Sequence, residues 1–258
     1  MPQQPTSARE QAKNQRRDDI LEAARRLIRQ SRDFSFSMRA LAEEAGVSIA
    51  TPYNLFGSKQ AILLAVLDAD LAHYQAALGA LKADAIDVLF EAVTLMTEHL
   101  TGEPDFYRSV LAGLSKEGGP RFRMMVSGPR YLMWKRLLGQ AAEAGLIRHD
   151  LDPDAFAVTL SQLIFANVIE WAQGTLTPAE MDARIRYGLA LALLAVATDR
   201  SRKLLDARLR GAEQALQRLW RNHLSERLKH GPLDDDTRAL LADQLKHLDH
   251  PPADEASQ

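Results

Sequence analysis

The pattern of apolar and polar positions is helical along the chain and is sharpest in residues 37–59. Within 38–45, apolar residues are spaced at i, i+3, i+4 and i+7: Met38, Leu41, Ala42 and Ala45. This spacing predicts a short helix with one buried face. Ser37 precedes it as an N-cap, and Gly46 follows where a left-handed C-cap residue is needed.

A second short helix is predicted between Ser48, as its N-cap, and Gly57, and Ser58 is expected to cap a longer third helix over 58–81. Pro52 lies near the start of the second helix, where proline is tolerated, although it could shift the N-cap to Thr51. Two short helices joined by a tight turn are typical of a helix-turn-helix, whose second helix enters the DNA major groove.

The residues before this segment predict one more helix, over 17–31, with a buried stripe of Ile20, Ala24, Leu27 and Ile28. The three-helix core is too small to be stable alone, so we expect the helix over 58–81 to dock it on the rest of the chain. Residues 1–15 are polar and predicted to be a disordered arm. Its basic residues could reach DNA, but a solvated tail is the simpler interpretation.

Everything after residue 84 reads as helix, over 84–100, 104–116, 120–144, 153–173 and from 178 onward. The third of these should be split at 127–129, where proline follows glycine. Asp152 with Pro153, and Thr177 with Glu180, mark two helix starts. No period-two alternation of strands is present, so the fold class is all-α.

The helices at 153–173 and 178–197 carry more apolar surface than one buried face requires. A second buried face indicates a dimer interface, and a central core helix is the alternative. The last helix does not clearly stop at residue 197, because an apolar seam continues at spacings of four and three: Leu205, Leu209, Ala212, Leu216 and Leu219.

Charge is unevenly distributed along the C-terminal part of the chain. Residues 198–230 hold nine Lys/Arg against four Asp/Glu, whereas 231–258 hold two against seven. We expect the acidic segment to fold back on the basic helix.

Within residues 17–67, the sequence resembles the DNA-binding signature of the TetR-type transcriptional regulators. The residues that carry the resemblance are Gly46, Val47, Ser48, Thr51, Tyr53, Phe56, Ser58 and Lys59. Pro52 departs from the pattern, which often has leucine there. The resemblance implies an N-terminal three-helix helix-turn-helix module and a larger α-helical ligand-binding and dimerisation domain. It also favours a homodimer through the helices 153–173 and 178–197.

The resemblance gives candidate DNA contacts on the helix-turn-helix: Arg39, Ser48, Ile49, Ala50, Thr51, Tyr53, Asn54 and Lys59. Of these, Ile49 and Ala50 suit a thymine methyl group, Asn54 suits adenine, and the others suit guanine or phosphate. Lys59 also stands out physically, because a cation in the first turn opposes the helix dipole unless an anion binds there.

Aromatic residues and methionines gather in the middle of the chain, which indicates either an ordinary core or a pocket for an apolar ligand. The resemblance favours the pocket. Its candidate lining residues are Met96, His99, Phe106, Tyr107, Met125, Tyr131, Trp134 and Asn167, with Arg130 as a further polar anchor.

Composition excludes several classes of function. The chain has no cysteine, which removes disulfides and thiolate chemistry, and no catalytic, nucleotide-binding or metal-binding motif is present. We therefore expect no catalytic residues, cofactor or metal site. The apolar run 188–197 is far shorter than the roughly 20 residues of a membrane span, so a cytoplasmic protein is expected.

These observations predict four regions: a disordered arm (1–15), a helix-turn-helix domain (16–60), a helical effector-binding and dimerisation domain (61–200), and a C-terminal extension (201–258). The expected function is a dimeric regulator, a repressor of a palindromic operator that a small apolar ligand releases from DNA. A helical small-molecule-binding protein, a constitutive DNA-binding protein and a helical enzyme are the alternatives.

Overall fold

The computed structural model describes residues 8–30, 36–81, 83–115, 128–230 and 234–249, and these are almost entirely helical. It contains no strand in these residues, in agreement with the predicted all-α class. The helices are α1 (Ala8–Gln30), α2 (Met38–Glu44), α3 (Ala50–Phe56), α4 (Lys59–Ala80), α5 (Ala85–Gly102), α6 (Pro104–Ser115), α8 (Pro129–Glu143), α9 (Pro153–Ala172), α10 (Pro178–Leu194), α11 (Asp199–His230) and α12 (Asp235–Asp249).

The helix starts that the sequence marks are present. Ser37 and Ser58 each accept a backbone hydrogen bond as N-caps of α2 and α4. Thr177 and Glu180 form the predicted capping box of α10, and Asp152 caps α9 ahead of a proline. Gly46 has φ 64°, the left-handed conformation predicted for the turn after α2.

The first helix differs from the prediction, because α1 begins at Ala8 rather than at residue 17. The predicted disordered arm is therefore helical from residue 8, and residues 1–7 lie outside the described part of the chain. Its sequence, AREQAKNQRR, consists largely of good helix formers. Once the core has nucleated α1, these residues extend it at little cost.

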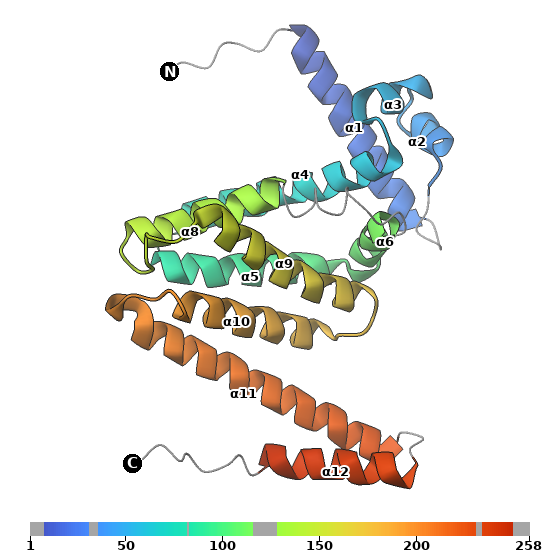
Figure 1. Ribbon diagram of the computed structural model, residues 1–258. Helices are drawn as coiled ribbons and strands as arrows, with labels where there is room; N and C mark the ends of the chain where they lie inside the picture. The colour runs from blue at the N-terminus through green and yellow to red at the C-terminus, as the bar shows by residue number, and fades with distance from the viewer. Residues whose placement is uncertain (1–7, 31–35, 82, 116–127, 231–233, 250–258) are drawn as a thin grey trace.

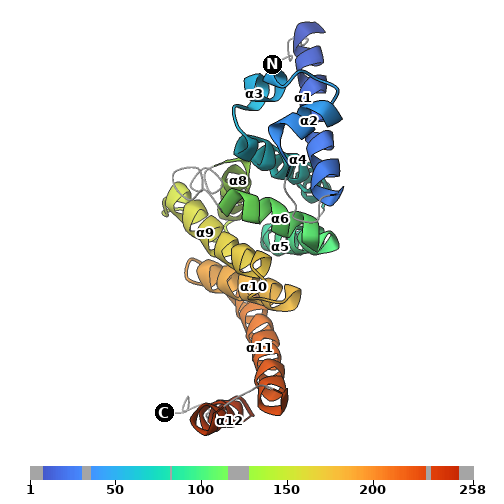
Figure 2. The ribbon, with the colours of Figure 1, turned by 90° about the vertical axis from the view of Figure 1, so that its right-hand side faces the viewer.

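The molecule is elongated, with α1–α3 at one end and α12 at the other (Figures 1 and 2). The helix α4 runs from the small N-terminal module into the body, where it packs with α5, α6, α8, α9 and α10. One continuous hydrophobic core runs from Ile20 of α1 through α4 to Leu205 of α11. The N-terminal module is thus docked on the body through α1 and α4.

A break separates α10 from α11, where the sequence suggested one continuous helix. The backbone N–H of Arg148 donates to Val196 O, and that of Thr198 donates to Leu146 O. The Thr198 hydroxyl also donates to Gly145 O at 2.8 Å. These bonds to the segment after α8 end α10, and α11 then turns back across α10.

The apolar seam of α11 packs inside its own chain. Leu205, Ala212 and Leu216 are buried, and α11 contacts α10 more extensively than any other pair of helices. On α10, a second row of apolar side chains stays partly exposed, with Leu191 43% exposed and Tyr187 and Leu194 half-buried. The apolar surface of α10 is therefore partly covered by α11 and partly left exposed.

The acidic helix α12 folds back against the far end of α11 (Figure 1). Leu241 is buried there, and Arg238 donates to the Leu228 carbonyl at 3.0 Å.

By length and composition alone, α4 and α9 would be long enough to cross a membrane. The core helices of globular proteins pass the same test, and both pack in the core here.

Candidate functional site

Two large apolar side chains, one at the N-cap of α3 and one within it, are about half exposed to solvent. Ile49, just before α3, is 52% exposed, and Tyr53, one turn later, is 49% exposed. Ala50 and Asn54 are exposed beside them. These four predicted contact residues therefore form one open surface on α3.

Polar predicted contacts surround this surface. Ser48 Oγ and Thr51 Oγ1 lie 2.9 Å apart and share a hydrogen bond. Arg39 is highly exposed, and its Nε donates to Glu43 at 3.0 Å. An exposed pair of this kind is worth at most about 1 kcal/mol, so the Arg39 guanidinium can exchange its partner for another acceptor.

The effect of Pro52 on α3 is small. The helix begins at Ala50, and Ile49 occupies the N-cap position without a side-chain cap bond, so neither Ser48 nor Thr51 takes the predicted role. Pro52 is buried as the third residue of α3. The first four N–H groups of a helix have no intrahelical partner, so the missing N–H costs nothing there.

Lys59 has a local partner that the sequence did not suggest. Its Nζ lies 4.7 Å from the centroid of the Phe36 ring, at the first residue of α4. The ring stabilises a cation that the helix dipole disfavours. At the same, C-terminal end of α3, Arg17 fixes the helix by donating to Leu55 O at 2.6 Å and lying over the Phe56 ring.

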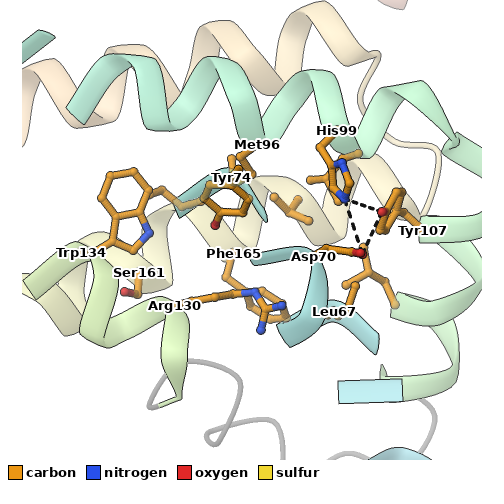
Figure 3. A pocket seen from close by; sticks show the side chains of 14 residues that line it. Leu67, Asp70, Tyr74, Met96, His99, Tyr107, Arg130, Trp134, Ser161 and Phe165 are labelled. Atoms are coloured by element: carbon orange, nitrogen blue, oxygen red, sulfur yellow. Dashed lines mark hydrogen bonds and ion pairs between the residues drawn. The ribbon is translucent and has the colours of Figure 1, made fainter. Parts of the chain in front are cut away.

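The body contains a partly open cavity of about 90 Å³ between α4, α5, α6, α8 and α9. Its walls are mostly apolar, and its lining residues are Leu67, Asp70, Tyr74, Met96, His99, Leu100, Tyr107, Leu111, Arg130, Trp134, Ser161, Ile164, Phe165 and Val168. Figure 3 shows Asp70, His99 and Tyr107 together at one end, with Trp134 and Ser161 at the other.

Four of the eight predicted pocket residues line this cavity: Met96, His99, Tyr107 and Trp134. Phe106 is buried behind Tyr107, with the two rings edge to face. Tyr131 instead donates to Asp154, and Asn167 donates to Leu163 O at 2.8 Å. Met125 lies outside the described residues.

The polar end of the cavity is bonded to the N-terminal module. Asp70 of α4 accepts from Arg25 of α1 and from the Tyr107 hydroxyl at 2.8 Å. The Tyr107 oxygen lies 2.6 Å from His99 Nε2, and because its own proton goes to Asp70, it accepts from that nitrogen. Arg25 also donates to Val66 O at 3.0 Å. One carboxylate therefore joins the cavity wall to α1.

Burial and neighbouring charges shift the pKa values of the ionisable groups at the cavity. Burial acts to raise the pKa of Asp70, but the hydrogen bond from His99 and the charge of Arg25 outweigh burial and lower it. Burial and the neighbouring Asp70 carboxylate raise the pKa of Tyr107, and burial raises that of Tyr74 to about 12. At neutral pH, Asp70 is therefore an anion and both tyrosines are un-ionised.

A second contact between α1 and the body lies beside the first. Arg29 makes two hydrogen bonds to Glu103, at 2.7 and 2.9 Å, and its guanidinium lies 5.2 Å from the Phe106 ring centroid. The Arg25 guanidinium also faces that ring. Phe106 is therefore a docking residue for α1 rather than a lining residue of the cavity.

Sequence reasoning missed Asp70, the central residue of this cluster. A signal was available, because Asp70 lies between Leu67, Leu71 and Tyr74 on a helix whose neighbours are mainly apolar. A carboxylate within an apolar stripe is rarely buried without a partner. Its partner Arg25 is 45 residues away, so the pair itself could not be read from local spacing.

Ser161 was also missed. It lines the cavity, and its buried hydroxyl has no hydrogen-bond partner in the described structure. In the described residues, no group of three His, Asp or Glu side chains is arranged to hold a metal ion.

The sequence model of the bacterial regulatory proteins of the tetR family matches residues 20–66, which cover α2, α3 and parts of α1 and α4. A comparison with curated protein sequences gave no match.

Solved structures extend the similarity into the body. Thermus thermophilus FadR, a TetR-family transcriptional repressor in complex with lauroyl-CoA, is 26% identical, with TM-score 0.58 over 70% of this chain and 95% of that one. A TetR transcriptional regulator from Rhodococcus sp. RHA1 (21% identity, TM-score 0.55, 74% and 100% coverage) and a TetR transcription regulator from Haloarcula marismortui ATCC 43049 (16%, 0.51, 72% and 100%) share the fold.

About a quarter of this chain has no counterpart in these structures, which are covered almost completely. The matched module at residues 20–66 and the fold shared with these regulators support a TetR-type DNA-binding transcriptional regulator.

Proposed function

We propose that the protein is a dimeric repressor that binds a palindromic operator through α3 and leaves it when a small apolar ligand enters the body. The observation that carries the DNA-binding part is the exposure of Ile49 and Tyr53 on α3. Apolar contact with thymine methyl groups and a hydroxyl at a phosphate would use both side chains. The other proposed contacts are Arg39, Ser48, Ala50, Thr51, Asn54 and Lys59.

The proposed dimer forms through α9 and α10, around the exposed row of Tyr187, Leu191 and Leu194. These residues are spaced i, i+4 and i+7 on α10, where Leu191 is exposed and the other two are half-buried. In a two-fold dimer each recognition helix would meet one half-site, and the half-sites would lie about 34–36 Å apart or slightly more. Leu191→Glu should give a monomer in analytical ultracentrifugation and weaken operator binding; a dimer of unchanged stability would contradict this interface.

The cavity is the proposed effector site, and its size argues for a coupled movement. An apolar cavity of about 150 Å³ holds one benzene molecule, and the cavity here is about 90 Å³. A larger ligand must therefore separate the walls. The lauroyl-CoA bound by the related Thermus thermophilus FadR supports an apolar chain as the ligand class.

Separation of the walls would act on α1 through Asp70. The carboxylate lines the cavity and binds Arg25 of the DNA-binding module, and α4 continues from Asp70 back to Lys59 beside α3. A ligand that displaces Asp70 or Tyr107 would loosen this junction and change the separation of the two recognition helices. Affinity for the operator would then fall, because only the undisturbed dimer fits the half-site spacing.

The DNA-binding part is tested by selecting a duplex from a randomised pool with the wild-type protein and measuring binding by gel shift. Ile49→Ala and Tyr53→Ala should each cost about 1–3 kcal/mol of affinity for the selected duplex. Trp220→Ala is the matched control, since this exposed aromatic side chain lies on α11, far from α3. Unchanged binding by both α3 variants would refute the assignment.

The effector part is tested by adding lauroyl-CoA or free lauric acid to the complex with the selected duplex. We expect release of the duplex and a raised melting temperature for the wild type. Val168→Phe, which fills part of the cavity, should bind the duplex normally and lose the response. A protein that binds the duplex but responds to no apolar ligand would be a constitutive DNA-binding protein.

A further inference from the structure

The buried row of α1 continues toward the N-terminus as a basic row. In the core, this face carries Ile20, Ala23 and Ala24, all fully buried. Moving back along the helix at spacings of four, three and four residues from Ile20 gives Arg16, Lys13 and Arg9. Residues at these spacings lie on one face of a helix, so the face that packs on α2 and α4 becomes wholly cationic beyond the core.

Most charges on this part of α1 are segregated by sign. Arg9, Lys13 and Arg16 are exposed, Asp18, Asp19 and Glu22 lie on the opposite half of the helix, and Glu10 in the first turn lies to the side of the basic row. A solvated helix end has no need for one wholly basic face, since mixed signs would keep it equally soluble.

The position of these turns suits a partner that already lies against α3. Residues 8–19 precede the first buried residue of α1, and twelve helical residues extend it by about 18 Å. Figures 1 and 2 show the N-terminal turns of α1 rising past α3. Arg17, in the same segment, holds α1 to the end of α3 through Leu55 O. The basic face therefore continues the surface proposed to meet DNA.

We infer that Arg9, Lys13 and Arg16 form a second DNA contact, which binds the phosphate backbone next to the site read by α3. This inference rests on the proposed DNA-binding function and extends its surface. Arg9 and Arg16 are seven residues apart, or about 10 Å along the helix. A DNA strand carries one phosphate per roughly 3.4 Å of axis, so three cations match about three phosphates. The contact adds affinity without reading sequence.

The test compares the salt dependence of binding to the duplex selected with the wild-type protein and to an unrelated duplex of equal length. In Arg9→Gln/Lys13→Gln/Arg16→Gln, the slope of log K against log salt should fall by about 3, roughly 1 for each lost phosphate contact, for both duplexes. The nuclease footprint on the selected duplex should shorten at its outer ends. The base preference of the wild type should be retained.

A matched control removes the same charge elsewhere. Lys203→Gln/Arg210→Gln/Arg227→Gln takes three exposed cations from α11 and should leave the slope and footprint unchanged. An equal loss of slope in both triple variants would overturn the inference, as would a wild-type slope in the α1 variant whose helicity and melting temperature are unchanged.

Different outcomes would contradict the second contact on α1 and the proposed DNA-binding function. A wild-type protein that selects no duplex overturns both, whereas a wild type that selects one while the α1 variant matches it overturns only the second contact. The variant Arg9→Lys/Arg16→Lys keeps the charge but changes the shape of the side chains. Binding and salt slope like those of the wild type in this variant would support a phosphate contact over a shape-specific protein partner.

Discussion

Arg25 of α1 donates a hydrogen bond to the carboxylate of Asp70 on α4, and both side chains are almost buried, at 12% and 10% exposure. This pair connects α1 of the DNA-binding module directly to a residue that lines the cavity. A charged pair in this setting is strongly coupled, because removing either partner leaves the other charge buried without compensation.

Breaking this pair from either side should therefore destabilise the fold. We expect Arg25→Met and Asp70→Leu each to lower the free energy of unfolding by about 3–5 kcal/mol, measured by urea denaturation. The double variant should lose clearly less than the sum, since it leaves no unpaired charge. Strictly additive losses would show that the two side chains act independently.

Acid should weaken the protein through the same carboxylate. The pKa of Asp70 in the folded protein lies below its ordinary value of 3.8, so its contribution is complete above about pH 4 and is lost as the pH falls through the folded-state pKa. Urea denaturation between pH 3 and pH 6 should show this loss in the wild type. Asp70→Asn should be less stable at pH 6 and less sensitive to acid.

The hydroxyl of Ser161 should contribute nothing to stability without a ligand. It is buried and unpaired in the described structure, and replacing an unsatisfied polar group with an apolar one is neutral or stabilising. Ser161→Ala should keep or raise the melting temperature. The control is Ser201→Ala, which removes a buried hydroxyl that donates to Leu146 O and should cost about 1 kcal/mol. Equal losses would mean that Ser161 has a partner.

The approach of α9 to α10 should be sensitive to one methyl group. A Cβ at Gly188 would lie 2.7 Å from Leu163 Cδ1, whereas a Cβ at Gly139 on α8 would meet nothing within 4 Å. We expect Gly188→Ala to lower stability by about 1–3 kcal/mol and Gly139→Ala to raise it by up to about 1 kcal/mol. Thermal denaturation of the two variants would compare them directly.

The C-terminal helix should stabilise the far end of α11. Ending the chain at residue 230 removes α12, uncovers the surface under Leu241 and deletes the Arg238 contact. The melting temperature should fall, and the opposite net charges of the two segments predict that the difference shrinks at high salt. A truncated chain that melts like the full chain would contradict a role for α12 in stability.

The sequence predicted correctly those helix starts that depend on hydrogen bonds between residues close in the chain. Ser37, Ser58 and Thr177 cap the helices predicted for them, because an N-cap bond involves residues two or three apart. The end of α10 was not predicted, since it depends on hydrogen bonds from Arg148 and Thr198 across about fifty residues. The same limit explains why aromatic clustering located Met96, His99, Tyr107 and Trp134 but not Asp70, whose partner is on α1.

The unbroken course of α1 has a mechanical consequence. Arg9 and Arg25 lie sixteen residues apart on one helix, which is an arm of about 24 Å. A rotation of α1 by about 5° around Arg25 displaces Arg9 by about 2 Å, which is enough to break a hydrogen bond. A change too small to separate helices visibly at the cavity is therefore magnified at the outermost turn, which makes spectroscopic distance labels near Arg9 a sensitive reporter of cavity occupancy.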